Sequence, residues 1–216
     1  MSFRKEKKFR LSLYEVSKMK ANLQLIGLEP LYPARTINSC YFDSRNLSMF
    51  EDSEEGVLPR KKVRVRWYND NNRFVKETKI SSLEGRFKFT EEIISAKAET
   101  EVYDSQYFDG QYGNLLPGLL VSYDREYFSL ESMRVTFDKN IRYQLINKRG
   151  FGIRWDPECV MEIKIPADCG DDYVESVVGH PTSRFSKYSR GHLMFLGALS
   201  SQATQLNPLH DPPIVN

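Results

Sequence analysis

Residues that ligate transition metals or close disulfides are scarce in this chain of 216 residues, which contains three cysteines and three histidines. The cysteines form no CxxC pair, and His180, His192 and His210 lack the spacing of a zinc site. An odd number of cysteines without paired spacing argues against a disulfide framework. We therefore expect a reducing, cytoplasmic setting.

Membrane and export signals are also missing. No apolar run approaches the roughly 18 residues that a transmembrane helix needs. The N-terminal segment MSFRKEKKFRLSLYEV carries too many charges for a secretory signal peptide. The sequence thus predicts no membrane segment of its own. If the protein acts at the inner face of the membrane, a membrane protein partner must bring it there.

Several common catalytic and binding motifs are absent. The segment Arg149–Gly152 is too short for a phosphate-binding loop and lacks the Lys-Ser/Thr ending. No Ser-His-Asp set stands out. Lys and Arg number 31 against 29 Asp and Glu, so bulk charge gives no strong attraction to nucleic acid. The abundant Tyr and Phe fall at core-like positions, which speaks against an RNA-stacking platform. We expect no nucleic-acid partner.

What the chain does contain is cations at alternate positions of strand-like segments. They are Glu6-x-Lys8-x-Arg10, Lys62-x-Arg64-x-Arg66, Glu77-x-Lys79, Tyr123-x-Arg125 and Arg134-x-Thr136. A strand sends every second side chain to one face, so each segment has a cationic face and a largely apolar face. The cationic face can be an ordinary solvated surface. If the strands close into a barrel, it becomes an interior that requires a densely anionic guest such as polyphosphate.

The remaining pattern predicts a mainly β architecture. Strand signals occupy residues 3–12, 37–43, 60–68, 73–81, 86–90, 116–129, 133–146 and 158–166, and helical spacing occupies 13–27, 171–179 and 184–200. Residues 91–113 are mixed and polar. Mostly short turns between about eight strands favour an antiparallel closed sheet with flanking helices over a parallel design. We expect one domain over residues 1–200 and a flexible Pro-rich tail over 201–216.

One carboxylate could bind metal. Glu162 shares a strand face with Lys164, opposite Met161 and Ile163. It is either half of a surface ion pair or a ligand for a hard divalent cation such as Mg²⁺ or Mn²⁺, which prefer oxygen donors. Glu6 and Glu77 are further candidates, or salt-bridge partners of neighbouring cations.

These segments, in this order, resemble the VTC domain, the catalytic core of the vacuolar transporter chaperone polyphosphate polymerases. That domain belongs to the triphosphate tunnel metalloenzyme, or CYTH-like, superfamily. The matching segments are Lys8-Phe9-Arg10, Tyr41 to Ser44, Lys62 to Tyr68, Glu77 to Lys79, Ser122 to Arg125, Arg134 to Asp138, Met161 to Lys164 and Phe185 to Tyr188. They span about residues 3–197. The chain resembles stand-alone prokaryotic-type members of the family.

The resemblance implies an α+β, mainly β fold: an eight-stranded antiparallel β-barrel tunnel with flanking helices. It implies ATP and inorganic polyphosphate as ligands and Mn²⁺ or Mg²⁺ as cofactor. Predicted phosphate-binding residues are Lys8, Arg10, Lys62, Arg64, Arg66, Lys79, Lys88, Tyr123, Arg125, Arg134, Lys164, Ser186 and Lys187. Predicted metal ligands are Glu162 and Glu6, and the predicted catalytic residues are Lys187, Arg64 and Arg66.

One departure from the wider superfamily bears on function. The CYTH group opens with Glu-x-Glu-x-Lys, whereas here the frame reads Arg4-x-Glu6-x-Lys8. Replacing an acid by a base weakens a two-metal hydrolase interpretation. The expected function is a polyphosphate polymerase that transfers the γ-phosphate of ATP to a growing chain. A triphosphatase acting on triphosphate or a nucleoside triphosphate, and a non-catalytic polyphosphate-binding module, stay open as alternatives.

Overall fold

The computed structural model describes residues 4–69, 73–93, 96, 98–146, 152–166 and 171–205. Its elements are β1 (Arg4–Leu11), α1 (Leu13–Gln24), β2 (Glu29–Asp43), α2 (Ser48–Glu55), β3 (Arg60–Tyr68), β4 (Phe74–Ser82), β5 (Gly85–Ile93), α3 (Glu99–Tyr103), β6 (Tyr107–Asp109), β7 (Gly113–Leu130), β8 (Met133–Leu145), β9 (Arg154–Trp155), β10 (Cys159–Pro166), α4 (Asp171–Val178) and α5 (Lys187–Gln205). Most of the glycine-rich segment at 149–152, Cys169, and residues 206–216 of the expected tail lie outside the described ranges.

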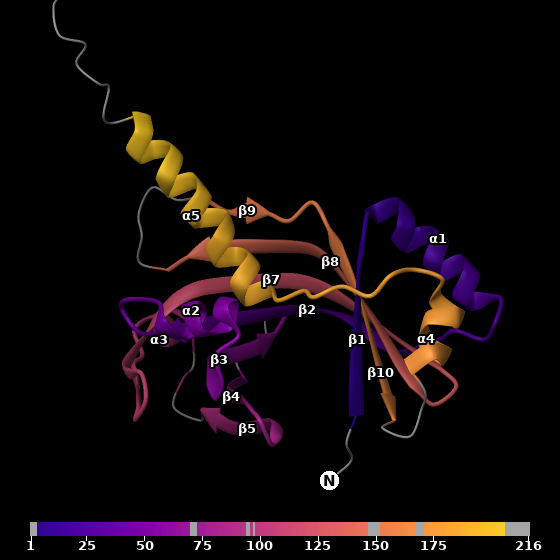
Figure 1. Ribbon diagram of the computed structural model, residues 1–216, viewed down its shortest axis with the longest axis horizontal. Helices are drawn as coiled ribbons and strands as arrows, with labels where there is room; N and C mark the ends of the chain where they lie inside the picture. The colour runs from indigo at the N-terminus through magenta and orange to yellow at the C-terminus, as the bar shows by residue number, and fades with distance from the viewer. Residues whose placement is uncertain are drawn as a thin grey trace, which may run out of the picture.

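The strands are antiparallel, as the sequence predicted, and they form one curled sheet. The hydrogen-bonded order is β1-β10-β8-β7-β2-β3-β4-β5, with the short β6 and β9 attached to β7 and β8. The long strands β2, β7 and β8 run through the middle of the sheet (Figure 1). The predicted mainly β class with flanking helices is confirmed. The eight strands of this path make a half-barrel, with β1 at one end of the order and β5 at the other.

Register brings the polar alternate positions of neighbouring strands onto one face. Lys8 lies opposite Glu162, Glu162 opposite Thr136, and Arg125 opposite Asp138. On the other half of the sheet, Ser39 faces Arg66, Arg64 faces Glu77, and Lys79 faces Lys88. Because directly paired residues point to the same side, this polar face is continuous across all eight strands. We call it the concave face.

The opposite face of β1, β10 and β8 carries a hydrophobic core that α1 and α4 cover (Figure 1). Phe9, Val135 and Met161 are fully buried there. Helix α1 begins with a capping box in which Ser12 and Glu15 exchange side-chain-to-backbone hydrogen bonds. Its Val16, Met19 and Leu23 face this core, so the amphipathic spacing is what docks the helix.

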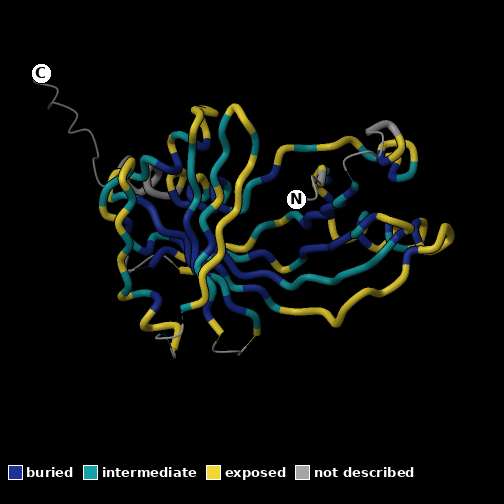
Figure 2. Tube along the Cα trace, turned by 90° about the horizontal axis from the view of Figure 1, so that it is seen from below, coloured by how far each residue is buried: buried dark blue, intermediate teal, exposed yellow. Residues whose placement is uncertain are grey.

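Two further cores fix the rest of the sheet. One joins the outer face of β2, β3 and β4 to Met49 of α2 and Val102 of α3. The other lies on the concave side, where α5 packs on β7 and β8 through residues such as Tyr188 and Phe195. Gly191 permits this close approach, because a Cβ there would meet side-chain atoms of Leu119 and Tyr143 at 2.7 Å. Buried segments run along the middle of the strands, and exposed ones mark the hairpin tips (Figure 2).

Some element boundaries differ from the sequence prediction. β2 begins at Glu29 instead of residue 37, because its first residues pair with β7. This part of the strand was not predicted, because it contains two prolines and its exposed residues show no alternation of apolar and polar side chains. α5 begins at Lys187 and continues to Gln205, into the region expected to be a tail. Within the polar stretch 91–113 lie α3 and β6.

None of the helices in the described part of the chain is both long and apolar enough to cross a lipid bilayer.

Candidate functional site

Cations outnumber carboxylates on the concave face. The cations of its middle part are Lys8, Lys62, Arg64, Arg66, Lys79, Lys88, Arg125, Arg134, Lys164 and Lys187, and the carboxylates among them are Glu6, Glu77, Asp138 and Glu162. Arg35, Arg86 and Glu92 lie on the same face toward its ends. Like charges at this density repel each other unless an anion joins them. The face is therefore suited to a polyanionic ligand.

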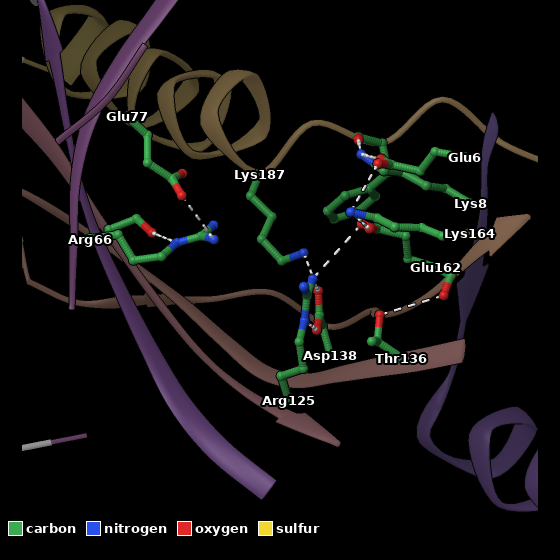
Figure 3. A network of polar contacts seen from close by, with 12 residues as sticks. Glu6, Lys8, Arg66, Glu77, Arg125, Thr136, Asp138, Glu162, Lys164 and Lys187 are labelled. Atoms are coloured by element: carbon green, nitrogen blue, oxygen red, sulfur yellow. Dashed lines mark hydrogen bonds and ion pairs between the residues drawn. The ribbon is translucent and has the colours of Figure 1, made fainter. Parts of the chain in front are cut away.

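Glu77 organises the cations of β3, β4 and β5. Its carboxylate accepts from Arg64 Nε at 2.7 Å and from Lys88 Nζ at 2.6 Å, and Arg66 lies 3.7 Å away. Burial opposes ionisation of Glu77, but Arg64 and Arg66 outweigh burial and lower its pKa to about 2. Arg64 also donates to the hydroxyl of Tyr41 at 2.9 Å. These contacts anchor both guanidinium groups on one carboxylate of the concave face, and Figure 3 shows Arg66 beside Glu77.

Asp138 organises the cations of the opposite half. It is fully buried and binds Arg125 through two hydrogen bonds of 2.5 and 2.7 Å. Lys187 Nζ lies 2.5 Å from the same carboxylate and 4.4 Å from the ring centroid of Tyr123. Burial opposes ionisation of Asp138, but Arg125 and Lys187 outweigh it and lower the pKa of the carboxyl group. In Figure 3, Lys187 points from the start of α5 to this pair.

Glu162 stands beside this group and continues the network to β1. Its carboxylate lies 3.2 Å from Lys164 Nζ and 3.8 Å from Arg125. Lys164 reaches Glu6 at 3.6 Å, and Glu6 reaches Lys8 at 3.1 Å. Burial disfavours the charged form of Glu162, but Arg125 and Lys164 outweigh burial and lower its pKa. Glu162 is therefore ionised at neutral pH.

The segment before α5 spans the concave face from β1 to β3. Ser183 N donates to the backbone oxygen of Lys8 at 2.8 Å, and Lys8 Nζ donates to the backbone oxygen of Phe185 at 3.2 Å. At the other side, Lys62 Nζ donates to Ser186 Oγ at 3.0 Å. The segment thus bridges the two halves of the half-barrel and roofs the cations between them.

Two lysines of this face have pKa values close to neutral pH. Lys79 is exposed on the concave face, but desolvation by the surrounding protein atoms and the charges of Arg64 and Arg66 lower its pKa to about 7. Burial also lowers the pKa of Lys62 to about 8, and the charges of Arg60 and then Lys8 add to the effect. An anionic ligand beside these two lysines would stabilise their charged ammonium forms and raise both pKa values.

The structure thus brings together most of the predicted site residues. Arg134 lies on the same face, and its Nε is buried without a hydrogen-bond partner among the described residues. Arg10 is the exception, because its guanidinium binds Glu158 near the exposed start of β10. The assignment of phosphate-binding and catalytic roles to these residues stays a prediction.

Two carboxylates beside Lys164 meet part of the coordination needs of a divalent cation. Glu6 and Glu162 come from adjacent strands and contact the same ammonium group, so both carboxylates can reach one cation. Mg²⁺ often takes one or two carboxylates and completes its shell with water and substrate phosphates. The described residues contain no cluster of three or more His, Cys, Asp or Glu, so the two glutamates fit a metal only together with phosphates. Glu77 is a salt-bridge partner of Arg64.

Sequence reasoning did not single out Asp138 or Tyr41 as site residues. Asp138 stands in phase with Arg134 and Thr136, so the alternation rule alone places it on the concave face. Tyr41 is buried beside Arg64. The charge of Arg64 and then of Arg66 outweighs burial and lowers the pKa of the Tyr41 phenol.

Solved structures with the same fold share little sequence with this chain. A conserved hypothetical protein from Pyrococcus furiosus has a TM-score of 0.53 at 14% identity, covering 86% of this chain and 99% of its own. A candidate adenylate cyclase from Bacillus halodurans has a TM-score of 0.52 at 12% identity, covering 100% and 95%. A candidate adenylyl cyclase from Hippeastrum, described as having a dominant triphosphatase activity, has a TM-score of 0.51 at 17% identity, covering 88% and 95%. A comparison with curated proteins gave no match.

The curled antiparallel sheet of this chain is the fold that these solved structures share. A family model described as the VTC domain matches residues 3–196. The protein belongs to the VTC domain family, as the resemblance of its motifs predicted.

Proposed function

We propose that the protein is a polyphosphate polymerase that transfers the γ-phosphoryl group of ATP to the end of a polyphosphate chain. One observation carries the proposal: cations line the concave face on both sides of Lys187 and outnumber the carboxylates there. Phosphoryl transfer depends mainly on positioning and charge neutralisation, and it needs no protein nucleophile. A face of this kind can hold a donor triphosphate and an acceptor chain at the same time.

Residues on different elements would have different roles in the transfer. Arg64 and Arg66, held in place by Glu77, would bind phosphate oxygens from β3, and Arg125 would do so from β7. Lys187 would lie between the two groups and stabilise negative charge on the oxygen that attacks or leaves. A bond forms between the γ-phosphorus and a terminal oxygen of the chain, the bond from the γ-phosphorus to the β–γ bridging oxygen breaks, and ADP leaves.

Glu162 and Glu6 would hold a Mn²⁺ or Mg²⁺ ion, which would neutralise charge on the transferred group. The presence of these two carboxylates among the cations argues against a module that only binds polyphosphate, because binding alone needs only cations. Arg4 at the start of β1 argues against the hydrolase, because it stands where the wider superfamily has a second acid.

Turnover of ATP by Arg64→Ala tests the site. We expect a loss of about a thousandfold or more, as for other arginines that neutralise a transferred phosphoryl group. The fold should survive, because Arg66 and Lys88 still compensate Glu77. Arg142→Ala is the matched control, since Arg142 lies against Trp155 on the outer face. Normal turnover by Arg64→Ala would remove this assignment.

A further inference from the structure

A pocket of about 390 Å³ lies at the end of the concave face, beyond the cations described so far. It is lined by Arg35, Tyr68, Asn69, Arg73 and Val75. Val75 pairs directly with Arg66, and Tyr68 follows Arg66 by two positions on β3, so the pocket opens on the face that carries the guanidinium groups. Two residues of strand span about 7 Å, so a ligand with a phosphate on Arg66 reaches the pocket with its next group.

The chemistry of the pocket differs from that of the phosphate site. The guanidinium of Arg35 lies 5.8 Å from the ring centroid of Tyr68 and 5.9 Å from that of Tyr127. Val75 adds an apolar wall. Aromatic rings and guanidinium planes are the surfaces on which nucleobases stack.

The cations of the pocket are too few for a second polyphosphate subsite. Arg73 is exposed and binds Glu92 at 2.9 Å, so much of its charge is already compensated. Around Glu77, by contrast, three cations share one carboxylate. The pocket therefore suits a flat, neutral, aromatic group with an anionic neighbour better than it suits a continuing chain of phosphates.

Its walls are fixed in place by hydrogen bonds between β2 and the end of β3. Thr36 N donates to Asn69 Oδ1 at 2.7 Å, and Asn69 N donates to Thr36 O at 2.8 Å. The hydroxyl of Thr36 donates to Asp124 at 2.8 Å. Asn69 takes a positive φ of 46°, which turns the chain out of β3 at the rim. Such a rim is preorganised for a ligand.

We propose that this pocket binds the base of the nucleoside triphosphate, with Tyr68 and Arg35 as the residues that recognise it. The inference rests on the proposed function, because it takes the phosphates to lie on Arg66 and its neighbours. It adds that the protein distinguishes a nucleotide from an inorganic polyphosphate at the end of the site. The chain of phosphates then extends from the pocket along the cations of the concave face.

Binding of two ligands tests the proposal: ATP, which has a base, and inorganic triphosphate, which has none. Each is titrated calorimetrically into the wild-type protein and into Tyr68→Ala and Arg35→Gln. Removing a stacking partner is expected to weaken ATP binding about tenfold. The affinity for inorganic triphosphate should stay within about twofold of the wild type for Tyr68→Ala, because no phosphate-binding group is lost.

Three control variants separate recognition from structural damage. Tyr68→Phe keeps the ring and should retain ATP binding. Trp155→Ala and Arg142→Gln alter an arginine–aromatic pair on the outer face and should change neither affinity. Arg35 is exposed, so Arg35→Gln does not threaten the fold.

The outcomes distinguish this inference from the proposed function. Loss of ATP affinity alone supports the base pocket. Equal weakening of both ligands, or no weakening of ATP, would overturn it while the phosphate site stands. If the wild-type protein bound neither ligand, the proposed function would fail and the base pocket would fall with it.

Discussion

Lys187 at the start of α5 and Asp138 of β8 are joined across 2.5 Å, and Arg125 binds the same carboxylate. This one buried acid therefore positions two cations that come from different elements. It also ties the segment roofing the concave face to the sheet beneath it. The positioning of the two cations and the attachment of this segment to the sheet both depend on Asp138, which is fully shielded from solvent.

We expect Asp138→Asn to destabilise the protein strongly. Breaking a buried ion pair by removing one partner typically lowers the free energy of unfolding by about 3–5 kcal/mol, because the remaining charge is uncompensated. Inorganic triphosphate should restore more stability to the variant than it adds to the wild type, since its charge replaces that of Asp138. Urea unfolding with and without triphosphate measures both effects. Asp109→Asn is the control, because it releases one cation, Lys61, while the amide oxygen can still accept from the backbone N–H groups of Gln111 and Tyr112. An equal gain for wild type and variant would contradict the account.

Glu162→Gln should separate turnover from binding. Turnover of ATP is expected to fall about a hundredfold or more, because a ligand of the divalent cation is lost. Metal-free binding of inorganic triphosphate should become tighter, because the change removes a negative charge beside Lys164 and Arg125. Glu91→Gln alters an exposed carboxylate paired with Lys76 and should change neither quantity. Weaker triphosphate binding by Glu162→Gln would show that Glu162 does not act as proposed.

Lys79 should make triphosphate binding depend on pH. Its pKa of about 7 means that it loses its charge as the pH rises through neutrality, so affinity should fall between about pH 6 and pH 8. The free energy of unfolding of the ligand-free protein should change with pH in the opposite direction. The folded pKa lies below the unfolded value of 10.5, so in that interval the unfolded chain binds more protons and stability rises with pH.

The variant Lys79→Arg isolates this contribution, because arginine stays charged throughout the range. Its affinity should fall less steeply with pH than that of the wild type, and titration calorimetry at several pH values measures the slope. Lys61→Arg serves as the control, since Lys61 lies on β3 but binds Asp109 outside the site. The titration of the ligand itself is common to all three proteins. Identical slopes for wild type and Lys79→Arg would rule out Lys79 as the titrating group.

Gly191→Ala should disturb the site through α5. The added methyl group would meet Leu119 and Tyr143 at 2.7 Å, so the helix has to shift. We expect a loss of about 1–3 kcal/mol in the free energy of unfolding, typical of overpacking, together with a lower turnover because Lys187 moves. In the same helix, a Cβ at Gly197 would contact nothing within 4 Å. Gly197→Ala should therefore keep full turnover, and equal effects of the two substitutions would argue against a positioning role for α5.

Alternation in the sequence was enough to predict which side chains share the concave face. Lys62, Arg64 and Arg66 stand at alternate positions of one strand, and the structure places them on one face. Alternation does not give register, so the partnership of Arg125 with Asp138 could not be predicted from either segment alone. Register depends on how β7 and β8 pair, including the irregularity between Ser122 and Asp124.

The base pocket illustrates a second limit. Arg35 belongs to the part of β2 that was not predicted as a strand, because its neighbours include prolines and are exposed. Tyr68 was predicted only to end the strand over residues 60–68, and the tyrosines in general were assigned to core-like positions. Their proximity arises from the pairing of Ile37 with Tyr68 and of Arg35 with Arg125, which no local pattern specifies.

The fate of the γ-phosphate of ATP distinguishes polyphosphate synthesis from hydrolysis and from simple binding. The protein would be incubated with ATP labelled in the γ-phosphate and Mn²⁺, and the products separated on a gel that resolves polyphosphate. If the protein is a polyphosphate polymerase, we expect labelled chains longer than triphosphate, ADP in proportion to them, and no such chains from Arg64→Ala. Label recovered only as free phosphate would contradict the polymerase and favour hydrolysis. Unchanged ATP, with tight binding of added polyphosphate, would contradict both and leave a binding module.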